Sequence, residues 1–123
     1  MQRRNFVKLS GVAAALQCLP SIGFSQQGDV FRIGSLTPIT GAGSPYGPGM
    51  HQAIRLAVDE VNAAGGAGGR KLERFTEDDQ TKPDAAVLAA KKLIEVNKVQ
   101  AVLGTWASGV TLAVMPLTDA AGI

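Results

Sequence analysis

The chain has 123 residues, with 12 Lys and Arg against 10 Asp and Glu, 46% hydrophobic residues and 5% aromatic residues. This length allows one modest domain, and the formal net charge of +2 is too small to indicate a nucleic-acid or membrane-surface partner. A single cysteine excludes an internal disulfide framework and a multi-cysteine metal cage, and a single histidine excludes an all-histidine metal site.

Residues 1–25 have the pattern of an export signal. Three basic residues and no acidic residue precede an apolar run at residues 9–19, which Pro20 ends before the small-residue stretch GFS. A basic segment, a short apolar run and a small-x-small end are typical of a secretory signal peptide. The run is shorter than the about 20 apolar residues that span a bilayer. We therefore expect a cleaved signal and no membrane anchor in this segment.

The sequence leaves two alternatives for the export route. The opening QRRNFVK resembles the twin-arginine motif, although Gln2 and Val7 depart from its usual residues, and a general secretory signal is the alternative. Cys18 lacks the small residue that usually precedes a lipid-modified cysteine, so a lipoprotein is less favoured. Without residues 1–25, nine basic and ten acidic residues remain, giving a net charge of −1 and no cysteine.

The remaining sequence alternates strand and helix patterns. We expect strands at residues 31–36, 71–76 and 99–104, and helices at residues 50–64, 83–97 and 107–121. The strand segments are short, apolar-rich and bounded by turn residues, and the helix segments repeat apolar residues at three- and four-residue spacing. Pro83 suits the first turn of a helix, whereas Pro116 is expected to kink or shorten the third helix.

Strand–helix alternation with short connections predicts an α/β fold with a doubly wound parallel sheet and right-handed crossovers. The final AAGI has the pattern of a helix end that leads into a fourth strand. Three parallel strands alone leave unprotected edges. We therefore expect residues 26–123 to be the amino-terminal part of a longer lobe, ending before its fourth strand.

In an open parallel sheet, ligands bind beyond the carboxyl ends of the strands, where the winding reverses. With the strand order 2-1-3, residues 37–46 and 105–109 flank that crevice. The helix start after Gly104 offers unpaired N–H groups that suit a carboxylate, and Ser108 adds a hydroxyl donor. Two alternatives stay open: Ser108 is simply a helix cap, and Trp106 belongs either to a cleft wall or to the core.

Sequence patterns for a nucleotide, metal or catalytic site are weak. The stretch GAGSPYG lacks the ending of a phosphate loop, and Tyr46 stands where a dinucleotide fingerprint needs glycine. Asp78 and Asp79 fit a metal or phospho-acceptor pair, but paired acids at a strand exit more often cap the next turn. His51 has no acidic or serine partner nearby in the sequence and is expected to face solvent. We expect no catalytic residue, no metal, no cofactor and no nucleic-acid partner.

From residue 31 onward the chain resembles the periplasmic branched-chain amino-acid-binding proteins, which are the type I substrate-binding proteins of ABC importers. The resemblance rests on PITG with YG after the first strand, VNAAGG at the end of the first helix, DD before the second helix, GTWASGVT after the third strand, and the final AGI. Each motif alone is weak, but their order and spacing are specific and cover essentially everything after the signal.

The resemblance implies the first three βα units of a type I periplasmic-binding-protein lobe. It implies a monomeric, non-enzymatic periplasmic protein whose two lobes close on a small molecule and deliver it to the membrane permease of an ABC importer. The expected ligand is a branched-chain amino acid or a similar small amino acid, amide or carboxylate. The alternatives are a sensory ectodomain of the same fold and, least favoured, an α/β enzyme.

The resemblance also assigns ligand-binding residues. It implies that Ser108, with backbone groups of Ala107 and Gly109, binds the ligand's carboxylate, and that Tyr46 lines the side-chain end of the cleft. Trp106 and Ala107 occupy the pocket-wall positions before the serine. Trp106 is larger than the residues found there in leucine-binding members, so the branched-chain specificity is open.

Overall fold

The computed structural model describes residues 30–123, so the expected signal at residues 1–25 lies outside it. The elements in chain order are β1 (Phe31–Thr37), α1 (Gly47–Ala63), β2 (Leu72–Asp78), α2 (Pro83–Lys91), the π-helical segment η1 (Lys92–Val96), β3 (Ala101–Gly104) and α3 (Ser108–Ala121). The three strands are parallel in the order β2-β1-β3. The expected α/β fold with strand order 2-1-3 is confirmed.

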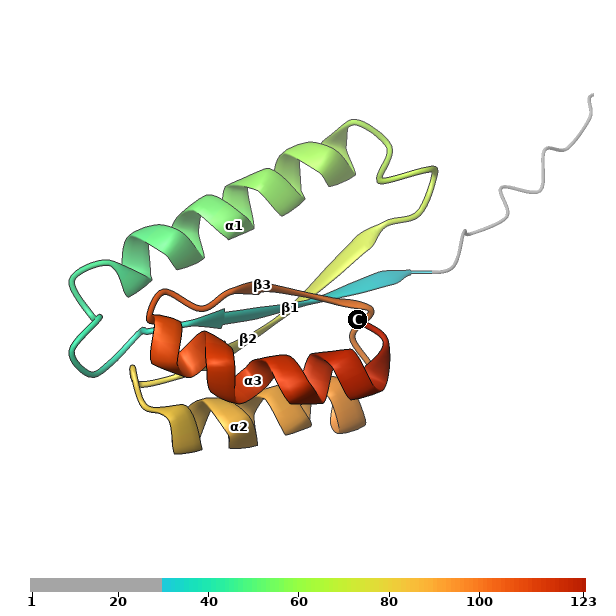
Figure 1. Cartoon of the computed structure of the whole chain (residues 1–123). Helices are drawn as coiled ribbons and strands as arrows, with labels where there is room; N and C mark the ends of the chain where they lie inside the picture. Colours follow the sequence, from blue (N-terminus) through green and yellow to red (C-terminus); the bar gives the residue numbers. More distant parts are fainter. Residues whose placement is uncertain (1–29) are drawn as a thin grey trace, which may run out of the picture.

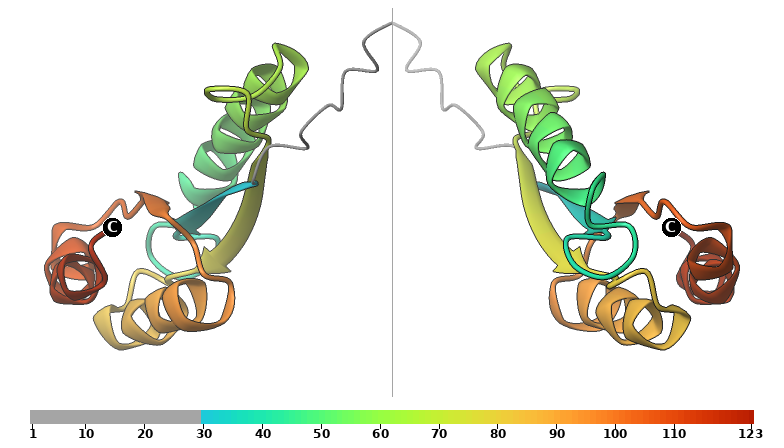
Figure 2. Two further views of the ribbon diagram at one scale, coloured as in Figure 1. Left: turned by 90° about the vertical axis from the view of Figure 1, so that its right-hand side faces the viewer. Right: turned by 90° about the vertical axis from the view of Figure 1, so that its left-hand side faces the viewer.

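The central strand β1 sets the geometry of the sheet. Its full length pairs with β2, from Phe31 opposite Leu72 to Thr37 opposite Asp78, and its second half pairs with β3. α1 covers one face of the sheet, whereas α2, η1 and α3 cover the other (Figures 1 and 2). Because the strands are parallel, their carboxyl ends meet at one edge, where the segments after β1 and β3 lie side by side.

The core lies between the sheet and the layer formed by α2 and α3. Leu36, Leu93 and Val110 are at most 1% exposed, and buried alanines of α2 pack around them. Gly34 makes room for Leu93, because a Cβ at this position would lie 3.0 Å from Cδ1 of Leu93. Removal of this apolar surface from water is the main stabilising contribution in this layer.

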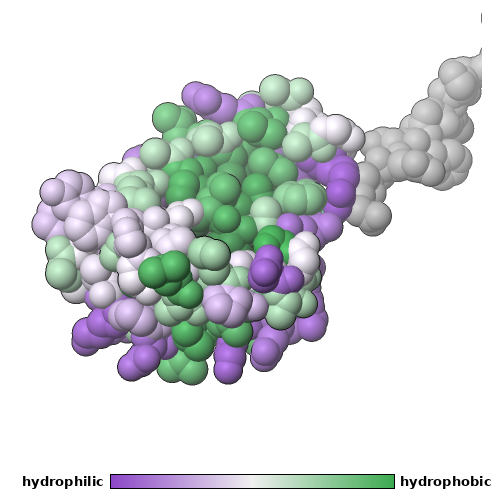
Figure 3. All heavy atoms as spheres, in the orientation of Figure 1, coloured by the Kyte–Doolittle hydropathy of each residue, from purple (hydrophilic) through white to green (hydrophobic). Residues whose placement is uncertain are grey.

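The other layer is α1 alone, and much of it is open. Val58 is buried and Met50 and Ile54 are half-buried, but the rest of the apolar stripe expected on this helix is exposed. Figure 3 shows hydrophobic side chains gathered over α1 and the β3 side of the sheet, where Val61 and Leu103 are exposed. The expected helix is confirmed, and its apolar residues stay partly open because within residues 30–123 no second helix packs beside α1 on this face.

Several element boundaries differ from the expected ones. α1 begins at Gly47, with Pro48 in its first turn, and β2 extends to Asp78. The second helix ends in a π-helical turn, where the N–H of Asn97 donates to the carbonyl of Lys92, five residues earlier. No helix within residues 30–123 is both long and apolar enough to cross a membrane.

Of the two outcomes expected at Pro116, shortening of the third helix is wrong, and a kink stays a prediction. α3 continues through Pro116 to Ala121, and Gly122 then ends it with a left-handed φ of 70°. A proline at position 116 removes the helical hydrogen bond to the carbonyl of Leu112. Leu112 and Pro116 are both exposed, so the missing hydrogen bond lies on the solvent side of α3 and not in the core.

Leu93→Ala is expected to lower the free energy of unfolding by about 2–5 kcal/mol, because it leaves a cavity beneath Gly34 in the closed layer. Leu88→Ala is the matched control, since Leu88 lies five residues earlier and is 70% exposed. It is expected to change the same quantity by less than about 0.5 kcal/mol. Urea denaturation of both variants measures the difference, and equal effects would contradict this description of the core.

Candidate functional site

β1 and β3 leave the sheet in direct contact. Leu36 pairs with Gly104 at the last rung, and the N–H of Thr105 donates to the carbonyl of Leu36 at 2.8 Å. Gly104 has a φ of 118°, and a Cβ there would lie 2.1 Å from that carbonyl oxygen. Only glycine allows this approach. It positions residues 105–107 beside the loop that follows β1.

The loop at residues 38–46 is held against the turn that follows β2. The backbone N–H and the hydroxyl of Thr40 both donate to the carboxylate of Asp78, and the N–H of Gly43 donates to the hydroxyl of Thr81 at 2.8 Å. The loop ends at Tyr46, which is the N-cap residue of α1. These contacts fix where the aromatic side chain of Tyr46 leaves the backbone.

Asp78 and Asp79 cap the turn after β2, as expected. Oδ1 of Asp78 accepts the N–H of Gln80 at 2.9 Å, and Oδ1 of Asp79 accepts the N–H of Thr81 at 2.7 Å. Burial acts to raise the pKa of Asp78, but the hydrogen bonds from Thr40 and Gln80 outweigh it and lower that pKa below its ordinary value. Burial raises the pKa of Asp79, and the neighbouring Asp78 charge adds to this effect.

Tyr46 and Trp106 form a stacked aromatic pair between the two strand exits. Their ring centroids lie 4.9 Å apart and their planes differ by 20°. Tyr46 is 56% exposed and Trp106 is 48% exposed, so neither ring belongs to the core. The alternative that Trp106 is a core residue is therefore wrong. The pair leaves about half of each aromatic side chain exposed at the carboxyl edge of the sheet.

The start of α3 adjoins this surface and carries no cap. Ala107 is the N-cap residue, no side chain caps the helix, and its first turn contains no acidic residue. Ser108 is the first helical residue and is exposed, as is Gly109. The alternative that Ser108 caps the helix is therefore wrong. The first amides of the helix have no intrahelical partner and carry the positive end of the helix dipole, so this end suits an anion.

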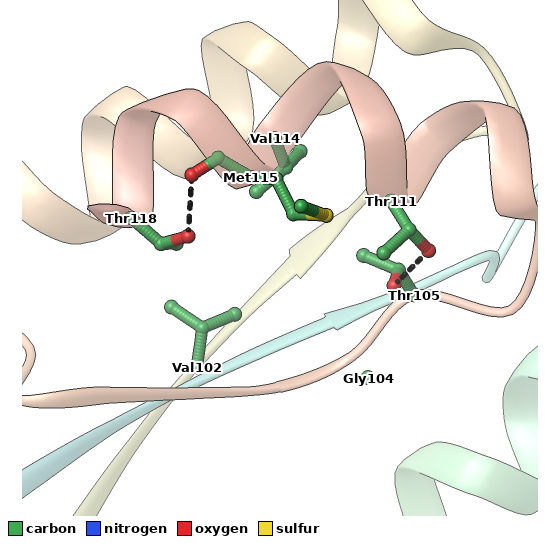
Figure 4. A pocket seen from close by; sticks show the side chains of 7 residues that line it. All are labelled: Val102, Gly104, Thr105, Thr111, Val114, Met115 and Thr118. Carbon is green, nitrogen blue, oxygen red and sulfur yellow. Dashed lines mark hydrogen bonds between the residues drawn. The ribbon is translucent and has the colours of Figure 1, made fainter. Parts of the chain in front are cut away.

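A hydroxyl pair fixes the segment that carries Trp106. The hydroxyl oxygens of Thr105 and Thr111 lie 2.7 Å apart, and the hydroxyl of Thr111 also donates to the carbonyl of Ala107 at 3.2 Å. Figure 4 shows the pair at the mouth of a cavity of about 180 Å³ between β3 and α3. Sequence reasoning missed it, because the contact depends on a left-handed turn at Thr105, whose φ is 56°.

The structure brings together the residues that the sequence assigns to the site. Tyr46 is the N-cap residue of α1, residues 106–109 lie at the beginning of α3, and the stacked rings join the two segments. Their contacts with a ligand stay predictions. His51 lies apart from them and is half-buried, with Nδ1 3.3 Å from Nη1 of Arg74, so the expectation that it faces solvent is wrong. Within residues 30–123 no group of three or more His, Cys, Asp or Glu side chains is arranged to hold a metal ion.

Comparison with known proteins gives consistent matches. Residues 30–123 match a family model described as periplasmic binding protein. An amino acid binding protein of Pseudomonas aeruginosa is 35% identical over 91 residues, which cover 74% of this chain and 24% of the relative. The chain thus spans about a quarter of the length of the relatives that it matches.

Two solved structures contain a bound solute. The branched-chain amino acid transporter substrate binding protein LivJ from Streptococcus pneumoniae, in complex with isoleucine, matches with a TM-score of 0.74 at 33% identity, covering 77% of this chain and 27% of that one. A solute binding protein of an ABC transporter from Rhodopseudomonas palustris, in complex with 3,4-dihydroxy benzoic acid, matches with a TM-score of 0.66 at 30% identity, covering 73% and 24%.

Asp79→Asn is expected to raise the free energy of unfolding at pH 7 and to change it little at pH 3. A pKa raised in the folded state means that ionisation of Asp79 opposes folding as the pH rises above the ordinary value of 3.8. Below that value both states hold the proton. Asparagine keeps the size of the side chain and the acceptor for the N–H of Thr81. Urea denaturation at both pH values measures the effect.

Asp78→Asn is the matched control and is expected to act with the opposite sign. The lowered pKa of Asp78 means that its ionised form stabilises the fold above pH 3.8, and that this stability is lost as the pH falls. The substitution should therefore destabilise the protein at pH 7 more than at pH 3. The same sign for both variants at pH 7 would contradict the assigned electrostatics of this turn.

Proposed function

Because the chain belongs to the periplasmic binding protein family, we propose that it forms the first part of an extracytoplasmic solute-binding protein of an ABC importer. The proposed solute is a small amino acid, amide or other carboxylate, branched-chain amino acids included. The observation that carries the proposal is the stacked pair of Tyr46 and Trp106 beside the uncapped start of α3. An apolar surface and an anion-binding helix start adjoin each other at the edge where α/β sheets bind ligands.

The polar end of the proposed site is built from the start of α3. The hydroxyl of Ser108 donates to the solute's carboxylate, with help from the backbone amides around Ala107 and Gly109. Ser108 and Gly109 are exposed, and the side chain at the N-cap position, that of Ala107, makes no hydrogen bond to the first amides. A hydrogen bond to a charged group contributes about 1.5–3 kcal/mol, and the helix dipole adds about 0.3–1 kcal/mol.

The apolar end of the proposed site is the aromatic pair. The half-exposed rings of Tyr46 and Trp106 give the solute's apolar part a surface to cover, at about 25 cal/mol for each Å² removed from water. The two solutes named in the solved relatives, isoleucine and 3,4-dihydroxy benzoic acid, each combine one carboxylate with an apolar body. This combination matches the two ends of the site described here.

The remaining parts of the proposal come from the family. Relatives about three times as long as this chain are solute-binding proteins, so we propose a second lobe that closes over the carboxyl edge of the sheet and completes the site. Residues 1–25 direct export to the periplasm, and the loaded, monomeric protein delivers its solute to a membrane permease. The proposal assigns no reaction and no cofactor to the chain.

Ser108→Ala in the complete protein is expected to weaken the binding of a carboxylate solute by about 10- to 150-fold in Kd, as for one lost hydrogen bond to a charge. Isothermal titration against leucine, isoleucine, small amides and small aromatic acids measures it. Thr118→Ala is the matched control, since Thr118 lies at the other end of α3 and its hydroxyl donates to the carbonyl of Met115. It should leave Kd unchanged.

Two results would contradict different parts of this proposal. If the folded, complete protein binds none of these solutes, the proposed function is wrong. If a carboxylate solute binds equally well to the protein and to the Ser108→Ala variant, the function stands but Ser108 is not part of the site.

A further inference from the structure

We infer that the solute is a planar aromatic carboxylate of the benzoate class, and that Trp106 determines this choice over a branched aliphatic amino acid. The inference rests on the proposed function, because it assigns the solute class of the same site. It is carried by the stacked pair of Tyr46 and Trp106, by the way both rings are held, and by the charges of the segments that frame them.

The geometry of the pair favours a flat partner. The two rings are nearly parallel, with planes 20° apart and centroids 4.9 Å apart, and each is about half exposed. A third aromatic ring extends such a pair by offset stacking or by edge-to-face contact, which aromatic rings prefer at centroid distances of about 4.5–7 Å. A branched aliphatic side chain is not flat, so it covers less of the same surface.

The backbone that carries both rings is held by hydrogen bonds. The N–H of Tyr46 donates to the carbonyl of Gly43 at 2.9 Å, and its carbonyl accepts the N–H of Met50 at 3.1 Å. Trp106 lies directly after Thr105, whose hydroxyl contacts that of Thr111. A wall held in this way loses little conformational freedom on binding, and its shape therefore selects among solutes.

The charges of the framing segments suit the carboxylate end of the solute. Residues 38–46 and 105–109 contain no Asp or Glu. The acids of the nearby turn, Asp78 and Asp79, are engaged with backbone N–H groups of that turn. These segments therefore offer donors for an anion and an aromatic wall.

The spacing of the two ends fits a carboxylate that is attached directly to a ring. Trp106 precedes Ser108 by two residues, so their Cα atoms are at most about 7 Å apart. A benzoate places its ring and its carboxylate within this short span. The relative from Rhodopseudomonas palustris, solved with 3,4-dihydroxy benzoic acid, shares the family and takes a solute of this class.

The test compares two solute pairs by isothermal titration of the complete protein: benzoate and 4-hydroxybenzoate against leucine and isoleucine. The benzoates are expected to bind at least about 10-fold more tightly. Trp106→Leu should weaken the benzoates by about 3- to 10-fold, the range for one lost aromatic contact, without weakening isoleucine. Trp106→Phe keeps an aromatic ring and should retain the preference, which separates ring stacking from general packing.

A second readout uses fluorescence. The signal lost between the protein and its Trp106→Phe variant belongs to Trp106, and a stacked benzoate should change it. Thermal unfolding of each variant establishes that it is folded before titration.

The possible outcomes separate the inference from the proposed function. If isoleucine or leucine binds more tightly than the benzoates, or if Trp106→Leu leaves the ratio of affinities unchanged, this inference is overturned and the proposed function stands. If the folded protein binds neither class nor any other small carboxylate or amide, the proposed function itself fails.

Discussion

The contact between Gly104 and the last carbonyl of β1 is the constraint on which the site depends. A side chain at Gly104 would lie 2.1 Å from the carbonyl oxygen of Leu36, so β3 would have to leave the sheet earlier or farther from β1. Trp106 follows two residues later and would then not reach Tyr46. The close approach of β1 and β3 therefore brings into contact two side chains that are 60 positions apart in the sequence.

The turn after β2 supports the same arrangement from the other side of β1. Asp78 holds the loop at residues 38–46 through Thr40, and Thr81 holds it through Gly43. Tyr46 is therefore positioned by β2, although the loop itself follows β1. All three strands contribute to the placement of the aromatic pair, and this explains why it forms at the edge where their carboxyl ends meet.

The start of α3 lacks a side chain that caps the helix, and this arrangement suits the binding of an anion. Ala107 occupies the N-cap position, where Ser, Thr, Asp or Asn would stabilise the helix by about 1 kcal/mol. Ser108, one residue later, is exposed rather than bonded to the helix start. A carboxylate solute would satisfy the amides that the missing cap leaves open, so part of the stability absent from the free protein would appear as affinity.

The sequence predicts the order of elements from apolar periodicity, and it predicts the segments that flank the candidate site from the strand exits. The role of Tyr46 in that site comes from the family resemblance alone. The sequence does not predict the outcome at Pro116, where α3 continues on its exposed side despite the lost hydrogen bond. Nor does it predict the contact between Thr105 and Thr111, which depends on a strained turn. The open face of α1 likewise depends on which elements pack beside it, and periodicity alone carries no such information.

The most direct test of the account is a crystal structure of the complete protein with a bound carboxylate solute. The account predicts that a carboxylate oxygen lies within hydrogen-bond distance of the Ser108 hydroxyl, about 2.5–3.0 Å, and that the apolar part of the solute contacts Trp106 or Tyr46. A solute bound away from the carboxyl edge of the sheet, touching neither Ser108 nor the aromatic pair, would contradict it.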